Sequence, residues 1–305
     1  MGYVYLLCVA MMFSFGGTCV KLISPYFSAE YITLFRFVIG VMWLLILKKI
    51  KGQKSQADWK VIWKELGGWI VFGAAAKWMA YLTENYALSH GPSYGNIVVQ
   101  PMQTIFLTLM SVVMFKEKIT KKQMVCIGLC MAGVFLISWN GRSMEEFIGE
   151  NFLLLGLFLI SGICAGSHVL TQKMVADKMD IIDSNLVIFA ISAGFAIFPV
   201  LPSLTNKAMT GVRADIPCVA AILVFGFITG MGFYLNAKAI PLVPFYMVPI
   251  IQSTMVIFSI MWGVLFFHEK ISGYIVGGTV TFLVGLLGLQ LMSGKAKIKN
   301  AEYRE

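Results

Sequence analysis

Two opposite charges lie inside a segment of the chain that is otherwise apolar, and they are its first candidates for binding a solute. Lys77 and Glu84 stand seven residues apart, so a helix places both on one face with Tyr81 between them. A charged side chain at the centre of a bilayer costs about 2.5–3.5 kcal/mol on insertion scales. We therefore expect these side chains to face protein or water, in the wall of a cavity.

Part of the sequence occurs twice. Residues 87–138 align without a gap on residues 239–290, a shift of 152 positions. The sharpest match is Phe-x-Glu-Lys-Ile, which stands at 115–119 and again at 267–271. Each copy reads apolar segment, short turn with a proline, apolar segment, charged turn, apolar segment. A repeat of about half the chain predicts a duplicated membrane unit whose two halves face one another.

The repeat adds a second helix face to the expected cavity. The shift of 152 positions relates the face of Lys77, Tyr81 and Glu84 to a second set of residues. These are Thr229, Phe233 and Asn236. Both faces are polar and aromatic. We therefore predict that the two faces line one substrate-binding cavity between the halves, each from its own side.

Four further side chains are candidates for the same substrate-binding site, and each has a structural alternative. Arg36 lies about a turn and a half inside an apolar segment, where it binds either the substrate or a carbonyl or carboxylate of the protein. Gln100 and Gln252 occupy matching positions of the two copies. Because buried amides need hydrogen-bond partners, they bond either each other or a ligand. Trp78 either lines the pocket or packs against a neighbouring helix.

The composition is that of a protein with many membrane spans. Of the 305 residues, 58% are hydrophobic and 13% are charged, whereas soluble domains average about 45–50% and about 25%. The formal net charge is +9, and the lysines stand in short loops, where they act as topology signals beside lipid headgroups. The expected partners are the lipid bilayer and a small-molecule substrate, with a coupling proton or a counter-substrate, and no nucleic acid.

The sequence lacks the residue patterns of catalysis and metal binding. The six cysteines lie almost entirely in apolar segments, without the spacing of a disulfide framework or a metal site. No His-Glu-x-x-His motif, no Gly-x-Ser-x-Gly motif and no phosphate-binding loop for ATP occurs in the chain. We therefore predict a protein that is not an enzyme, with no catalytic residue, no metal site and no cofactor.

Ten segments are long and apolar enough to cross a bilayer, which takes about 20 helical residues. They are residues 3–22, 31–48, 66–89, 94–115, 123–139, 152–172, 184–202, 217–240, 245–267 and 273–293. The predicted fold class is an all-α membrane protein with ten transmembrane helices.

The number of spans in each half has a consequence for the architecture. Five is odd, so the second half must be inverted relative to the first. We assign residues 1–139 to the first five-helix repeat, 140–151 to an extracytoplasmic linker, 152–293 to the second five-helix repeat and 294–305 to a basic cytoplasmic tail. In two inverted repeats, one half can rock against the other, so that a site at their interface faces each side of the membrane in turn.

The placement of the lysines predicts the orientation in the membrane. Lysines are concentrated in the loops 48–64 and 116–122 and in the tail 295–304, which share one side if every segment crosses. Basic loops remain in the cytoplasm. We expect a multi-pass protein of the cell membrane, plasma or inner, with both termini cytoplasmic.

Several short motifs together resemble a known family. Leu-Phe-Arg-Phe-x-x-Gly at 34–40 opens the second segment, Ala-Leu at 87–88 followed by Pro92 ends the third, and Phe-x-Glu-Lys-Ile follows the fourth and the ninth. This pattern is similar to EamA-type transporters of the drug/metabolite transporter superfamily. The resemblance implies an inverted-repeat bundle with a central cavity and secondary transport of small metabolites. Members handle amino acids, nucleotide sugars, phosphorylated sugars, carboxylates and amphipathic cations, so the resemblance selects no single substrate.

We predict a secondary transporter, an exporter or exchanger, that moves small polar metabolites by alternating access. Lys77 and Arg36 outnumber Glu84 among the expected buried groups, which favours anionic or zwitterionic solutes such as amino acids or carboxylates. The alternative is multidrug-type efflux of lipophilic or quaternary ammonium cations. It requires Lys77 to be paired within the protein, leaving Glu84 and aromatic rings to hold the cation.

Overall fold

The computed structural model describes residues 1–52, 59–93, 95–115, 120–141, 143, 152–175, 178–205, 214–239, 242, 251 and 254–302. Every regular element in these residues is a helix, so the predicted all-helical fold is confirmed. The candidate site residue Gln252, most of the predicted linker 140–151 and residues 53–58 of the predicted lysine-containing loop lie outside the described residues.

The described helices belong to the two halves of the chain. The first half contains α1 (Gly2–Ser14), α2 (Gly16–Ile23), α3 (Ala29–Ile50), α4 (Trp59–His90), the 3-10 helix η1 (Gly95–Val98), α5 (Val99–Phe115) and α6 (Lys121–Trp139). The second half contains α8 (Phe152–Val175), α9 (Ile181–Thr205), α10 (Ile216–Ala239), α12 (Met255–Phe267) and α13 (Gly273–Glu302).

Several helix ends follow directly from local sequence. Before α6, the backbone N–H of Gln123 donates to Thr120 Oγ1 at 3.3 Å, and the Thr120 N–H donates to Gln123 Oε1 at 2.8 Å. This reciprocal cap satisfies two N–H groups that a helix start leaves without partners. At the other end, Asn140 (φ 50°) and His268 (φ 51°) adopt the left-handed conformation that closes α6 and α12.

The observed helices differ from the predicted segments mainly at four ends. The segment predicted at 66–89 begins earlier, at Trp59, so Lys60 and Lys64 of the predicted loop 48–64 belong to α4. The segment predicted at 94–115 begins as the 3-10 helix η1, and α5 starts only at Val99. The segment predicted at 245–267 appears as α12 from Met255 onward, and residues 243–250 are outside the described part. Helix α13 continues to Glu302, so most of the predicted basic tail extends this helix.

Five spans are long and apolar enough to cross a membrane by length and composition, counted over the described residues. They are Gly2–Ile23, which joins α1 and α2, Ala29–Ile50, Phe152–Gln172, Ile181–Pro202 and Ile216–Asn236. Helix α4 is not among them although it has 32 residues, and it carries both Lys77 and Glu84 in its interior. The protein is therefore a multi-pass integral membrane protein whose most polar long helix is α4.

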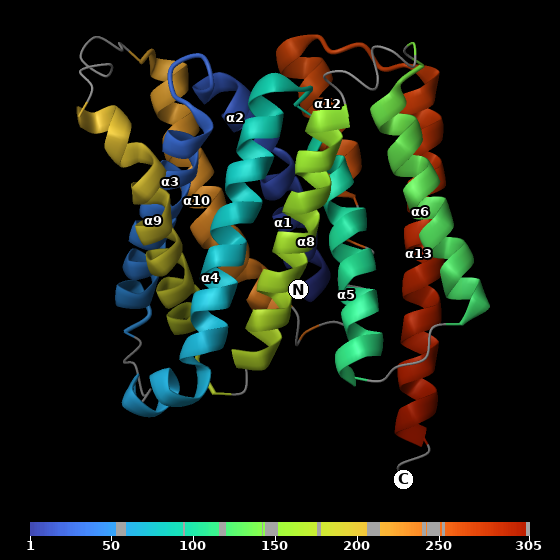
Figure 1. Ribbon diagram of the computed structural model, residues 1–305, viewed down its shortest axis with the longest axis horizontal. Helices are drawn as coiled ribbons and strands as arrows, with labels where there is room; N and C mark the ends of the chain where they lie inside the picture. Colours follow the sequence, from blue (N-terminus) through green and yellow to red (C-terminus); the bar gives the residue numbers. More distant parts are fainter. Residues whose placement is uncertain are drawn as a thin grey trace.

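The helices form one upright bundle, with successive helices running in alternating directions (Figure 1). Helix α4 packs along α8, and α3 packs between α9 and α10. Buried side chains of α3, α4 and α9 make one core cluster, which includes Phe37, Ile70 and Phe189. Helices α6 and α13 pack on each other at the right side of the view. The bundle thus places α3, α4, α8 and α10 around its polar interior.

Glycines allow α10 to approach α3 closely. A Cβ atom at Gly226 would lie 2.3 Å from Ile39 Cγ2, and one at Gly230 would lie 2.8 Å from the Gly40 carbonyl oxygen. Real Cβ atoms do not come so close to other atoms, so both positions require glycine. This close crossing brings Thr229 of α10 against α3 near Arg36.

Candidate functional site

A cavity of about 120 Å³ lies within the bundle, bordered by α1, α3, α4, η1, α5, α8, α10 and α12. Seven of the ten predicted site residues line it: Arg36, Lys77, Tyr81, Glu84, Gln100, Phe233 and Asn236. The sequence did not single out the other polar lining residues, which are Asn96, Gln103, Ser161 and Gln172. The apolar remainder of the wall is formed by Phe13, Ala80, Val99, Ala165, Val169 and Met255.

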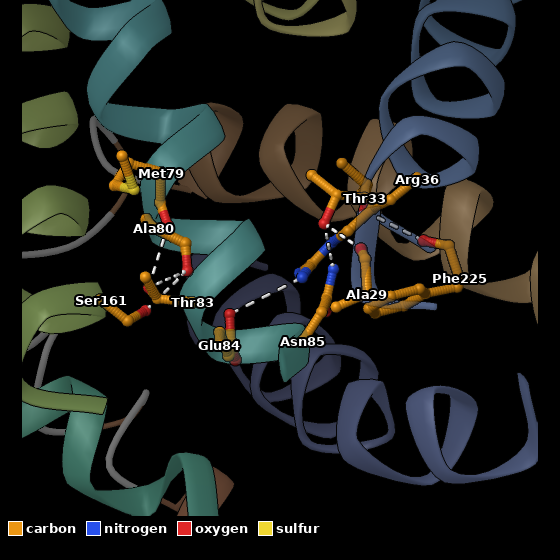
Figure 2. A network of polar contacts seen from close by, with 11 residues as sticks. Ala29, Thr33, Arg36, Met79, Ala80, Thr83, Glu84, Asn85, Ser161 and Phe225 are labelled. Atoms are coloured by element: carbon orange, nitrogen blue, oxygen red, sulfur yellow. Dashed lines mark hydrogen bonds and ion pairs between the residues drawn. The ribbon is translucent and has the colours of Figure 1, made fainter. Parts of the chain in front are cut away.

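The guanidinium of Arg36 is held from several sides. Its Nε donates a hydrogen bond to Thr229 Oγ1 at 3.0 Å, and its Nη1 lies 3.6 Å from Glu84 Oε2 (Figure 2). The Cζ atom lies 3.3 Å from the centre of the Tyr81 ring and 4.2 Å from that of Phe225. These contacts pair the positive charge with a carboxylate and with two aromatic faces. Arg36 therefore spans α3, α4 and α10 as a structural tie at the cavity wall.

A second polar link fastens α3 to α4 beside this ion pair. The side-chain amide of Asn85 donates to Thr33 Oγ1 at 2.9 Å, and the Thr33 hydroxyl donates to the Ala29 carbonyl at 2.7 Å (Figure 2). Both side chains are buried. The link sets how α4 lies along α3, and therefore where Glu84 meets Arg36.

Lys77 is placed differently from Arg36. Its side chain is only 5% exposed, and its Nζ lies 4.1 Å from the centre of the Tyr81 ring and 4.3 Å from that of Phe233. No carboxylate of the described residues forms an ion pair with Lys77, and no described residue hydrogen-bonds its ammonium. The rings stabilise the charge but accept no conventional hydrogen bond.

Two of the remaining predicted residues, Thr229 and Trp78, are not among the described residues that line the cavity. Thr229 is fully buried behind Arg36, which it positions, and its hydroxyl also donates to the Phe225 carbonyl at 3.0 Å. Trp78 points toward α9, where its ring centroid lies 5.9 Å from that of Phe195. Gln252 is outside the described residues. For Trp78 the structural alternative, packing against a neighbouring helix, matches its surroundings. The prediction that Thr229 lines the cavity is wrong, because the close crossing of α3 and α10 buries it against Arg36.

Carboxamide side chains make up much of the polar wall that the sequence did not reveal. Asn96 belongs to η1 and is 3% exposed, and its Oδ1 accepts no hydrogen bond from any described residue. Gln172 Nε2 donates to Asn185 Oδ1 at 2.9 Å. The spacing of Gln103 from Gln100, close to one helical turn, was the only signal in the sequence for any of these residues.

One end of the bundle is closed by polar contacts between the two halves. The carboxylate of Glu269 accepts hydrogen bonds from the Ser93 backbone N–H at 2.8 Å and from the Ser93 hydroxyl at 3.0 Å. The indole N–H of Trp262 donates to Ser14 Oγ at 2.9 Å. Glu269 belongs to the second Phe-x-Glu-Lys-Ile motif, so this copy of the motif has a structural role between the turns after α12 and α4.

Metal binding has no support within the described residues, where no group of three or more His, Cys, Asp and Glu side chains is placed to hold an ion. The cysteines are free thiols. Two cations and one carboxylate line it, and only Lys77 among the cations lacks a protein counter-ion in the described part of the chain.

Comparison with known proteins agrees with this architecture. Two uncharacterized transporters from two strains of Helicobacter pylori are each 26% identical to the chain over 299 residues, which cover 94% of this chain and 88% of theirs. A solved crystal structure superposes with a TM-score of 0.68 at 13% identity, covering 95% of this chain and 98% of that one, so it shares the fold.

The family comparison covers both halves of the chain. The family model described as the EamA-like transporter family matches residues 1–139 and again residues 153–291. These ranges coincide closely with the two sequence repeats. The chain belongs to the EamA-like transporter family, and it is a membrane transporter and not an enzyme.

Proposed function

We propose that this protein is a secondary transporter, an exporter or exchanger, of small anionic or zwitterionic solutes such as amino acids or carboxylates. The observation that carries the proposal is the unequal pairing of the two cations in the cavity. Arg36 has Glu84 as its counter-ion, whereas the ammonium of Lys77 lies over the Tyr81 and Phe233 rings and forms no ion pair in the described part of the chain. The cavity therefore offers a positive charge that a solute carboxylate can neutralise.

The surroundings of Lys77 make such a contact strong. The side chain is buried beside apolar and aromatic groups, where Coulomb interactions are much less screened than in water. A hydrogen bond between two ionised groups is also roughly twice as strong as one between neutral groups. The rival hypothesis, cation efflux, requires the opposite arrangement, with Lys77 paired and Glu84 unpaired. The pairing of Glu84 with Arg36 supports the anionic or zwitterionic solute.

The size of the cavity also favours a compact solute. A volume of about 120 Å³ is room for about four water molecules, at roughly 30 Å³ of liquid volume each. A solute of a few non-hydrogen atoms is on that scale. A lipophilic quaternary ammonium dye is considerably larger.

We further propose ten transmembrane helices in two inverted five-helix repeats. At the shift of 152, α4 (Trp59–His90) corresponds to α10 (Ile216–Ala239), and these two helices run in opposite directions in Figure 1. The contacts between the halves follow the same shift. It relates the contact of α4 with α8 to the contact of α10 with α1 and α2. It also relates α6 to α13, and these two helices pack on each other. A two-fold axis in the membrane plane explains both observations.

This architecture supports transport by alternating access. The cavity lies between helices of the two halves, and Glu269 and Ser93 join the halves at one end. Rocking one repeat against the other would exchange which end is closed. The lysine-rich loops predict that the loop between α3 and α4 and both termini are cytoplasmic.

Transport by purified protein in proteoliposomes tests the proposed substrate class. The substrates are labelled amino acids and dicarboxylates, with tetraphenylphosphonium as a lipophilic cation. We expect Lys77→Met to reduce transport of the best carboxylate substrate by roughly 10- to 100-fold, the range for losing a hydrogen bond to a charged group. Lys238→Met is the matched control, because Lys238 is an exposed lysine that does not line the cavity.

Two results would contradict the proposal. One is transport of tetraphenylphosphonium that survives Lys77→Met and is abolished by Glu84→Gln. The other is carboxylate transport that Lys77→Met and Lys238→Met reduce equally. The first result would establish cation efflux, and the second would remove Lys77 from the binding site.

A further inference from the structure

We propose that the cavity selects short-chain hydroxy acids, whose carboxylate binds Lys77 and whose hydroxyl donates a hydrogen bond to Gln172 Oε1. The inference rests on the proposed function and narrows it, among small anionic solutes, to those that carry a hydroxyl group. It begins with the side-chain amide of Gln172, which lines the cavity from α8.

Hydrogen bonds to α9 fix which way this amide points. The Nδ2 of Asn185 donates to the Ile181 carbonyl at 2.9 Å. A carbonyl can only accept, so the other end of the Asn185 amide, its Oδ1, is the atom that meets Gln172. This Oδ1 accepts from Gln172 Nε2 at 2.9 Å, and Asn185 is 2% exposed. The chain of two amides therefore leaves Gln172 Oε1 as an acceptor in a fixed orientation.

The Oε1 atom of Gln172 is open to the cavity. The side chain is half-buried, and no described residue donates a hydrogen bond to this oxygen. Fully buried oxygens without a partner do occur among the described residues, as at Asn96 Oδ1, but Gln172 Oε1 is not one of them. A solute in the cavity can therefore reach it. Since an amide oxygen only accepts, the solute must supply an O–H or N–H group there.

Gln172 and Lys77 are close enough for one short solute to contact both. A Cβ atom at Gly73, one helical turn before Lys77 on α4, would lie 2.5 Å from Cγ2 of Thr171, the neighbour of Gln172 on α8. The two residues thus differ in depth by about 6 Å, at 1.5 Å per residue. The two helices run in opposite directions (Figure 1). Because side chains lean toward the N-terminus of their own helix, these two lean toward each other.

The charges of the cavity favour a hydroxyl over an ammonium group at Gln172. The described lining residues include two cations, Arg36 and Lys77, and one carboxylate, Glu84. A hydroxy acid carries one negative charge and neutralises the excess. An amino acid brings its own ammonium, so the excess positive charge remains in a site where burial makes unpaired charge costly. A second carboxylate on the solute would meet Gln172 Oε1 without a donor.

The experiment measures binding of matched ligands to the purified full-length protein in nanodiscs. L-Lactate and 3-hydroxypropanoate are each compared with propanoate, which has the same carbon chain without the hydroxyl, and glycolate is compared with acetate. L-Alanine has an ammonium in place of the hydroxyl of L-lactate. The readout is the concentration that gives half-maximal thermal stabilisation. The ratio within each pair cancels any general effect of a substitution on stability.

We expect at least one hydroxy acid to bind about 3- to 10-fold more tightly than its analogue without the hydroxyl, the range for one net hydrogen bond. L-Lactate should also bind more tightly than L-alanine. Gln172→Met keeps the length of the side chain but removes the acceptor, so it should reduce the ratio to about one.

The matched control is Thr171→Val, which removes a polar group next to Gln172 on the same helix. Thr171 is not among the described residues that line the cavity, and its hydroxyl donates to the Ser167 carbonyl at 3.1 Å. This variant should leave the ratio unchanged.

Asn185 tests whether the orientation of the amide matters. Asn185→Leu leaves the Gln172 amide free to turn, so it should lower the ratio of hydroxy acid to analogue. Asn185→Asp keeps an acceptor for Gln172 Nε2 and should retain most of the ratio. If Asn185 only stabilised the fold, both variants would weaken the hydroxy acid and its analogue equally.

The results that would overturn this inference differ from those that would overturn the proposed function. Equal binding within all three pairs, with every carboxylate weakened by Lys77→Met, removes the role of Gln172 but keeps carboxylate binding. A ratio that survives Gln172→Met places the hydroxyl elsewhere. Tighter binding of L-alanine than of L-lactate overturns the choice of a hydroxy acid. A panel in which no carboxylate binds, while tetraphenylphosphonium does, removes both proposals.

Discussion

The thiol of Cys130 lies 3.8 Å from the backbone carbonyl oxygen of Phe282, the residue that follows it by the repeat shift of 152 positions. On either side, a Cβ atom at Gly133 would meet the Gly278 carbonyl at 2.6 Å, and one at Gly285 would meet the Cys126 carbonyl at 2.7 Å. The shift of 152 positions relates Gly133 to Gly285 and Cys126 to Gly278, so the two contacts are equivalent in the two halves. Helices α6 and α13 thus cross at equivalent residues, as a two-fold relation between the halves requires.

Bulk at this crossing should destabilise the protein. A methyl group at Gly133 or Gly278 would overlap backbone atoms of the opposite helix, so Gly133→Ala and Gly278→Ala should each lower the free energy of unfolding by about 1–3 kcal/mol. The controls are Gly128→Ala and Gly277→Ala, on the same two helices, where no atom lies within 4 Å of the new methyl group. Alanine there should be neutral or stabilising by up to about 1 kcal/mol. Denaturation in detergent measures the free energy of unfolding of the four variants. Equal destabilisation by the two crossing variants and the two control variants would disprove the close crossing.

The pair of Arg36 and Glu84 should show strong energetic coupling. Glu84→Gln leaves a buried guanidinium without its counter-ion, and Arg36→Met leaves a largely buried carboxylate, so each change destabilises the fold. The double variant should be about 1–3 kcal/mol more stable than the sum of the two single destabilisations predicts, because the effects of substitutions at contacting residues are not additive.

An exposed ion pair serves as the control for this double-mutant cycle. Lys178 and Glu65 also form an ion pair, but their side chains are 53% and 47% exposed. The coupling from Lys178→Met and Glu65→Gln should be below about 1 kcal/mol. A coupling for Arg36 and Glu84 no larger than this would mean that the two charges do not act as a pair.

The hydrogen bonds from Ser93 to Glu269 should hold the two halves together at one end. Ionised acceptors make the stronger hydrogen bonds, so Glu269→Gln should lower the free energy of unfolding by about 1.5–3 kcal/mol. Ser93→Ala removes only the hydroxyl contact and should have a smaller effect. Thermal unfolding in detergent shows whether Glu269→Gln destabilises the protein more than Ser93→Ala does. A tolerated Glu269→Gln would show that the carboxylate is dispensable there.

The proposed orientation predicts which loops are reachable from outside the cell. In a protein without its six native cysteines, a single cysteine in place of Glu146 should react with an impermeant thiol reagent. A single cysteine in place of Lys54 should react only after the membrane is permeabilised. Reaction of both positions in intact cells would exclude the proposed ten-span topology.

Most of the helices, and the face of α4 that lines the cavity, could be predicted from the amino-acid sequence. Apolar length predicted the helices, and the helical period put Lys77, Tyr81 and Glu84 on one side, because residues three and four apart share a face. The cost of charge in a bilayer then required that face to point inward. All three residues line the cavity. The 152-residue shift predicted two equivalent halves, and both match the family.

The pairing of the buried charges came from the packing of the helices. The sequence left open whether Lys77 is paired within the protein and whether Arg36 binds the substrate or a carboxylate, and the crossing of α3 with α4 and α10 paired Glu84 with Arg36. Asn96 gained its place from the 3-10 turn that follows α4, at a position where the sequence predicted a regular helix. Helical periodicity fixes the face of a residue on its own helix. The neighbour that this face meets depends on helix crossings and turn geometry, which are set by packing between segments far apart in the chain.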